Sequence, residues 1–168
     1  MTNSHPQQLG VLAKLVLTLA ALLLAAGVLW HGVTVAVLYR IWNNLINRPN
    51  EAMAFRFILQ PAMALIAAIN DGVKDARTGR SLYFWTVLND PQKRVARLRE
   101  GLNATARIIL LALAIDVIYQ IIVLRTFYPV EALLIGLQLA FVPYVLMRGP
   151  AARAARWWRR NAPAGQIR

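Results

Sequence analysis

The chain has 168 residues, of which 58% are hydrophobic and only 15% are charged, and its mean hydropathy is +0.48. Soluble domains carry charged side chains at about a quarter of their positions, so this balance argues against a soluble protein. Because cysteine is absent, disulfides, thiolate metal sites and a cysteine nucleophile are excluded. The apolar residues form long runs, which predicts an all-α integral membrane helical bundle that is a single domain over residues 1–168.

The formal net charge of +12 is compatible with nucleic-acid binding, but the positions of the basic residues argue against it. Most Lys and Arg residues fall in two blocks beside apolar runs, within residues 71–104 and 148–168. Such clustering is typical of the cytoplasmic loops of membrane proteins. No nucleic-acid recognition motif accompanies the charge. We therefore expect no nucleic-acid partner, and we expect a basic loop and a basic tail on the cytoplasmic side.

The first membrane span is predicted at residues 9–31. The apolar run continues to residue 39, and a helix over residues 9–39 would be about 45 Å long, whereas the hydrocarbon core is about 30 Å thick. Either the helix is tilted or only part of it spans. His31 is expected at the membrane interface rather than on a haem, because the second histidine, His5, lies in the polar terminus.

The second apolar segment, residues 53–70, decides between four spans and three. It is just long enough to cross and contains Arg56, Gln60 and Pro61. Its length favours a span, in which the long side chain of Arg56 would reach the outer interface. The positive-inside rule favours three spans, because a crossing leaves three arginines outside. We predict four spans, with three as the alternative.

The third span is predicted at residues 106–124 and should continue a helix that begins much earlier. Asp90 followed by Pro91 is the pattern of an N-cap and a first helical turn. No breaker except Gly101 separates this start from the apolar run. A helix is therefore expected to run from the basic loop directly into the span.

The fourth span is predicted at residues 130–147. Residues 125–129 allow only a very short turn, so the last two spans should form an antiparallel hairpin. Gly149 and Pro150 are expected to end the helix. The remaining residues, 148–168, would form the basic tail.

A polar cluster is predicted around Asp116, the only charged residue within residues 108–124 of the third span. A carboxyl group at this depth is costly and requires a partner or water. Tyr119 and Gln120 lie on the same helix face, and Gln60 of the second segment is expected to join them, with Gln60 or Asn70 donating to Asp116. The cluster is either a proton or ion site or a hydrogen-bonded clasp, in which each contact contributes about 0.6–2 kcal/mol. Without a second carboxylate at depth, the clasp is favoured.

Basic and aromatic residues at the ends of the apolar runs are predicted to contact anionic lipid head groups, where each cation contributes about 1 kcal/mol. These residues are Lys93, Arg94, Arg97, Arg99, Trp157 and Trp158. Catalytic signatures are missing from the sequence, including glycine-rich phosphate loops, HExxH and GxSxG. We expect no catalytic residues, no metal site and no cofactor.

Several segments carry a resemblance: FRFILQP, DGVKDARTGR, YFWTVLNDP, LREGLNATARIILLALAIDVIYQ and FYPVEALLIGLQLAFVPYVLMRGP. Over residues 55–158 they resemble uncharacterised small multi-pass inner-membrane proteins of proteobacteria. The resemblance implies a multi-pass protein of the bacterial inner (plasma) membrane and implies no activity.

The leading functional hypothesis is a non-enzymatic accessory or scaffold subunit, present as a homo-oligomer or within a larger membrane complex. The alternative is a proton- or ion-linked transport component that uses Asp116. A lipid-modifying membrane enzyme is the third possibility.

Overall fold

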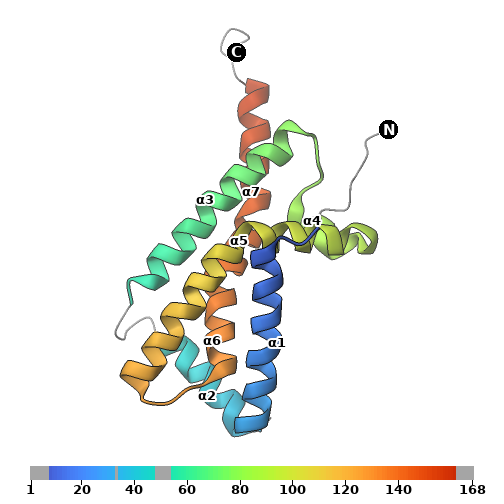
Figure 1. Cartoon of the computed structure of the whole chain (residues 1–168). Coiled ribbons are helices and arrows are strands. Elements are labelled where there is room, and N and C mark those ends of the chain that lie inside the picture. Colours follow the sequence, from blue (N-terminus) through green and yellow to red (C-terminus); the bar gives the residue numbers. More distant parts are fainter. Residues whose placement is uncertain (1–7, 33, 48–53, 162–168) are drawn as a thin grey trace.

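The computed structural model describes residues 8–32, 34–47 and 54–161, and all regular structure in these residues is helical. This confirms the predicted all-α class. In chain order, the helices are α1 Val11–His31, α2 Val35–Asn47, α3 Arg56–Arg77, α4 Tyr83–Asn89, α5 Pro91–Tyr119, α6 Pro129–Gly136 and α7 Val142–Asn161 (Figure 1). The π-helix η2, Gln120–Leu124, extends α5, and the π-helix η3, Leu137–Phe141, joins α6 to α7.

Three continuous helices are long and apolar enough to cross a membrane: Val11–His31, Pro91–Leu124 and Pro129–Asn161. They contain the third and fourth predicted spans and all of the first except residues 9 and 10. The second predicted span lies mostly within α3, and its first residue, Met53, is outside the described residues. Among the described residues α3 is not apolar enough to be counted with the other three. Four spans therefore stay a prediction.

The first apolar run is divided by Gly32. This residue adopts a left-handed conformation with φ of 66°, and its N–H donates to the carbonyl of Val28 at 2.9 Å. Glycine adopts this conformation without the steric penalty of a Cβ, so it ends helices readily. The resulting α1 has 21 residues and is about 32 Å long. Only this part of the run has the length of a span, and the chain continues as the separate helix α2.

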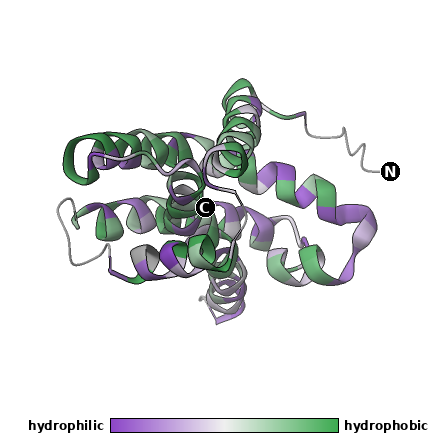
Figure 2. Cartoon of the chain, turned by 90° about the horizontal axis from the view of Figure 1, so that it is seen from below, coloured by the Kyte–Doolittle hydropathy of each residue, from purple (hydrophilic) through white to green (hydrophobic). Residues whose placement is uncertain are grey.

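The start of α5 is as predicted. The Asp90 side chain accepts a hydrogen bond from the N–H of Lys93 at 3.1 Å, and Pro91 occupies the first turn. The helix then continues without a break to Tyr119 and through η2 to Leu124. In Figure 2 hydrophilic residues concentrate on the first part of α5, whereas α1 is almost uniformly hydrophobic.

The turn between η2 and α6 is short and includes Arg125, which has a positive φ of 55°. The predicted hairpin is therefore confirmed. The predicted helix end at Gly149 and Pro150 is wrong, because α7 continues through both residues to Asn161. Pro150 removes one main-chain hydrogen bond, but its ring is on the exposed face and the following turn packs on α3. Residues 148–161 are thus helical, and residues 162–168 of the predicted tail lie outside the described residues.

Helices α3 and α7 lie side by side and run in the same direction (Figure 1). Asp71 contacts Tyr144 and Asp75 contacts Arg148, so the residue numbers increase together along the pair. Gly72 makes the close approach possible, because a Cβ there would lie 2.8 Å from both the Ala151 side chain and the Arg148 carbonyl. This packing places α3 acids beside α7 side chains and positions the largest polar site.

Candidate functional site

Asp116 is fully buried and pairs with Arg56. The Nη1 atom of Arg56 lies 2.9 Å from Oδ1 of Asp116, and both side chains are no more than 1% exposed. Arg56 also lies over the Tyr119 ring, 5.0 Å from its centroid. The first turn of α3 is thereby joined to the end of α5. The prediction that Arg56 reaches the outer interface is wrong, because its charge is neutralised inside the protein.

Gln120 links Asp116 to the hairpin turn. Its Nε2 donates to Oδ2 of Asp116 at 2.7 Å, and its Oε1 accepts the N–H of Tyr128 at 2.6 Å. A third contact runs from Nε2 to the Tyr128 carbonyl at 3.3 Å. A partly buried peptide group in a turn is stabilised by such partners. Gln120 thus holds the turn against the carboxylate, and its predicted place in the cluster is confirmed.

The other residues predicted near Asp116 are Tyr119, Gln60 and Asn70, and they differ in burial and in contacts. Tyr119 is buried beside Arg56, as described above. Gln60 is fully buried, but neither its amide oxygen nor its amide nitrogen has a hydrogen-bond partner in the described structure. Asn70 is exposed. The prediction that Gln60 or Asn70 donates to Asp116 is therefore wrong, because Arg56 and Gln120 occupy the carboxylate.

A second buried carboxylate, Glu131, lies in the first turn of α6 and is 1% exposed. Its Oε1 accepts from Nε of Arg40 on α2 at 3.1 Å, and the Arg40 guanidinium lies 4.0 Å from the centroid of the Tyr128 ring. His31 is partly buried, with Nε2 3.2 Å from the Phe127 carbonyl. The protein thus buries a second acid, Glu131, in addition to Asp116. His5 lies outside the described residues.

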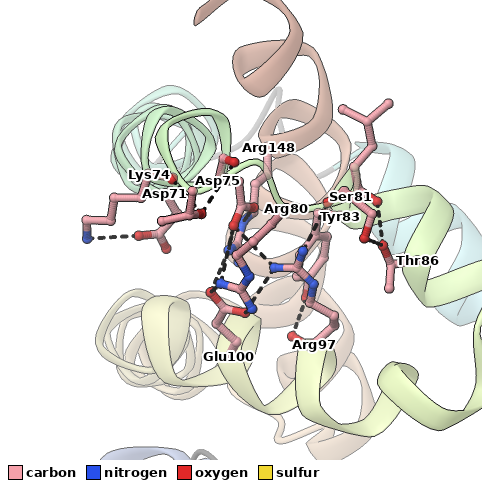
Figure 3. Close-up of polar contacts among 12 residues, drawn as sticks. Asp71, Lys74, Asp75, Arg80, Ser81, Tyr83, Thr86, Arg97, Glu100 and Arg148 are labelled. Atoms are coloured by element: carbon pink, nitrogen blue, oxygen red, sulfur yellow. Dashed lines mark hydrogen bonds and ion pairs between the residues drawn. The ribbon is translucent and has the colours of Figure 1, made fainter. Parts of the chain in front are cut away.

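The largest polar site is the Asp75 network, which joins α3, α5 and α7 (Figure 3). It consists of Asp75, Glu100, Arg80, Arg97 and Arg148. Asp75 accepts from Arg148 through both carboxylate oxygens, at 2.8 and 3.1 Å, and from Arg97 at 3.2 Å. Glu100 accepts from Arg148 at 2.6 Å and from both Nη atoms of Arg80 at 3.1 Å. Two carboxylates therefore hold three guanidinium groups, two of which are buried.

Tyr83 of α4 packs against this network. Its hydroxyl donates to the Arg97 carbonyl at 2.9 Å, and the Arg148 guanidinium lies 4.6 Å from its ring centroid. Burial raises the pKa of Tyr83 to about 12, although the charge of Arg148 opposes this shift. Gly101 on α5 leaves room for the hydroxyl, because a Cβ at that position would overlap it. The neutral phenol is thus enclosed by the helices.

Tyr144 of α7 connects the network to Asp71. Its hydroxyl donates to Oδ2 of Asp71 at 2.8 Å and accepts from Nη1 of Arg148 at 2.7 Å. Lys74 contacts the other oxygen of Asp71 at 3.1 Å. An open pocket of about 440 Å³ lies beside these residues and is lined largely by polar groups.

All six described acidic residues form ion pairs, the seventh acid being Glu51 outside the described residues. The pairs involve Asp71, Asp75, Asp90, Glu100, Asp116 and Glu131. No group of three or more potential metal ligands occurs among the described residues. The arrangement neutralises buried charges between helices, which is chemically suited to holding the helices together.

The predicted lipid-contacting residues divide into two groups. Five are exposed: Lys93, Arg94, Arg99, Trp157 and Trp158. Lys93 pairs with Asp90, and Arg94 donates to the carbonyls of Val87 and Leu88. The sixth, Arg97, is 4% exposed and bound to Asp75, so the prediction that it contacts lipid is wrong. Lipid contact by the five exposed residues stays a prediction.

The sequence does not indicate that the network residues come together, because their charges resemble a topology signal. By sequence alone, Arg148 belongs to the basic tail, Asp75 to the basic loop and Arg97 to the lipid-contacting residues. One signal was present: Asp71 and Asp75 are four residues apart, as are Tyr144 and Arg148. This matched spacing places each pair on one helix face, but it becomes informative only once α3 is known to lie beside α7.

No family model, curated protein or solved structure was found to match the chain.

Proposed function

We propose that the chain is a small multi-pass protein of the bacterial inner membrane that acts as a non-enzymatic accessory or scaffold subunit. In this role it packs against further copies of itself or against a larger membrane protein. One observation carries the proposal: every described carboxylate pairs with a cation of the same chain. Acid–base chemistry and ion transport require a carboxylate that exchanges partners, whereas a clasp requires one that keeps its partner.

The outer surface of α2 is an exposed apolar face on which another protein could pack. Residues spaced by three or four positions lie on one face of a helix. On α2 this face carries large apolar side chains that are each at least half exposed: Val35, Leu38, Tyr39, Trp42 and Ile46. A contiguous exposed apolar face of this kind is covered in the assembled state by lipid or by another protein.

Purification from native membranes in mild detergent, after cysteine crosslinking, tests the proposal. Because the chain lacks cysteine, each introduced thiol reports on one position. Leu38→Cys on the open face of α2 should form an adduct with a second copy or a partner. Ala13→Cys, which is buried in the described structure, should form none. A chain that stays monomeric, without an adduct at any exposed apolar position of α1 or α2, would contradict the scaffold role.

A second function, proton- or ion-linked transport through Asp116, is favoured by Gln60. This side chain is buried one helical turn beyond Arg56, and its amide has no hydrogen-bond partner in the described structure. A transported ion or a water chain would supply such a partner. Flux into proteoliposomes separates the two functions. Transport predicts a flux that Asp116→Asn abolishes while folding is retained, and the scaffold role predicts no flux in either protein.

A further inference from the structure

An open groove of about 500 Å³ lies between α3 and α7. Ile69 and Val73 of α3 and Ala155 and Trp158 of α7 line it, so its walls are mainly apolar. Arg77 and Arg159 also line the groove. Because α3 and α7 run in the same direction, these two arginines lie at the same end, the one near the C-termini of both helices.

The two arginines of the groove differ from those of the Asp75 network. Arg97 and Arg148 each contact two carboxylates. Neither Arg77 nor Arg159 forms an ion pair within the described residues, where every acid is paired with other cations. Two uncompensated guanidinium groups at the end of an apolar groove are complementary to an anionic group attached to hydrocarbon. Guanidinium groups also match the geometry of phosphate oxygens.

We propose that this groove binds one anionic phospholipid, with its phosphate between Arg77 and Arg159 and an acyl chain along the apolar walls. Trp158 lies where phosphate and hydrocarbon would meet, a position that tryptophan favours in membrane proteins. This binding site is independent of the scaffold role, since a lipid would occupy it whether or not the chain assembles with a partner.

The apolar wall extends beyond the groove along α3. Ile58 and Ile66 lie on the same helix face as Ile69 and Val73, and they are 78% and 61% exposed. The distance along the helix from Ile58 to Arg77 is about 29 Å. A continuous apolar surface of this length accommodates an extended acyl chain whose head group is at the arginine end.

Lipid binding to the detergent-purified full chain, measured by native mass spectrometry, tests the site. Phosphatidylglycerol and phosphatidylcholine are titrated separately against the wild type and two double variants. Arg77→Gln with Arg159→Gln should weaken phosphatidylglycerol binding by roughly 30-fold, because each cation near an anionic lipid contributes a factor of about five. The control, Arg153→Gln with Arg160→Gln, removes the same charge from exposed positions outside the groove and should leave binding unchanged.

Two further measurements identify the bound group. Ala155→Phe fills the groove without changing charge and should also weaken lipid binding, while the unfolding temperature in detergent verifies that each variant is folded. Inorganic phosphate at the concentration of the lipid should not displace it. Equal losses in the two arginine variants, equal affinity for both lipids, unchanged binding in folded Ala155→Phe, or displacement by phosphate would each overturn the proposal.

Discussion

Two of the buried polar regions in the described structure, those around Asp75 and Asp116, neutralise charge in different ways. Around Asp75, two carboxylates and three guanidinium groups from α3, α5, α7 and the α3–α4 connection share several contacts. Around Asp116, the ion pair with Arg56 is supplemented by a neutral amide, that of Gln120. The first region is redundant, because Arg148 contacts both Asp75 and Glu100. The second depends on a single acid, so one substitution there should have the larger effect.

The largest expected effect is that of Asp116→Ala. It leaves the Arg56 guanidinium buried without the Asp116 carboxylate, and breaking a buried pair in this way costs about 3–5 kcal/mol in the free energy of unfolding. Denaturant unfolding in detergent measures the loss. Replacing both partners, as Arg56→Met with Asp116→Leu, should recover most of it, because no charge remains buried. A single variant as stable as the wild type would mean that the pair is solvated and not a clasp.

Asp75→Ala should cost less, about 2–3 kcal/mol, because Glu100 continues to accept from Arg148 and Arg97. The redundancy is measured by adding Glu100→Ala. The double variant should lose more stability than the sum of the two single variants, because each acid compensates for loss of the other. Additive losses would show that the two carboxylates act independently and that the network is not redundant.

Gly101→Ala tests the packing beneath the Asp75 network. The added methyl group would overlap the Tyr83 hydroxyl and approach the Tyr144 ring, so we expect a loss of about 1–3 kcal/mol from overpacking. Gly149→Ala is the comparison, because it is also in a helix and its Cβ would meet nothing within 4 Å apart from its chain neighbours. Its Cβ would contact the ring of the adjacent Pro150, so we expect a loss smaller than that of Gly101→Ala. Equal effects of the two substitutions would argue against the tight contact at Gly101.

The smallest expected effect is the part of the pH dependence of the free energy of unfolding that is due to Tyr83. Burial raises its pKa to about 12 from the usual value near 10, so the folded state retains the phenol proton more strongly than the unfolded state. The stabilisation that results from this pKa shift is fully present below pH 10 and is lost as the pH rises from 10 to 12. At pH 11 the free energy of unfolding should be lower by about 1 kcal/mol for this reason. Unfolding measured from pH 9 to pH 12 should show this loss in the wild type. Tyr83→Phe should remove that part of the dependence, and an unchanged profile would mean that Tyr83 is not its source.

Parts of the fold were predictable because their causes are local. The long apolar run of α1, the Asp90 cap with Pro91 and the short turn before Pro129 each fix a helix or a boundary with a few neighbouring residues. The polar face of α5 was also predictable, since helical spacing alone places Asp116 and Gln120 together. These features need no knowledge of the packing partner.

The continuation of α7 past Pro150 was not predictable from local sequence. Gly149 and Pro150 are typical of a helix end, and the cost of a proline inside a helix is real. The structure extends the helix because Ala151 and Ala152 pack closely on Gly72 of α3. That contact lies about 80 residues away in the sequence, so local propensity carries no information about it.

The sequence by itself determined the three helices that are long and apolar enough to cross a membrane, and it indicated a buried acid in α5. Only the tertiary structure decided which cations neutralise the acids. Arg56, Arg97 and Arg148 look like interfacial charges in the sequence, yet each is buried against a carboxylate from another helix. The reason is physical: hydropathy and helical period depend on each residue and its near neighbours, whereas an ion pair depends on the parallel packing of α3 against α7 and the contact of α3 with α5.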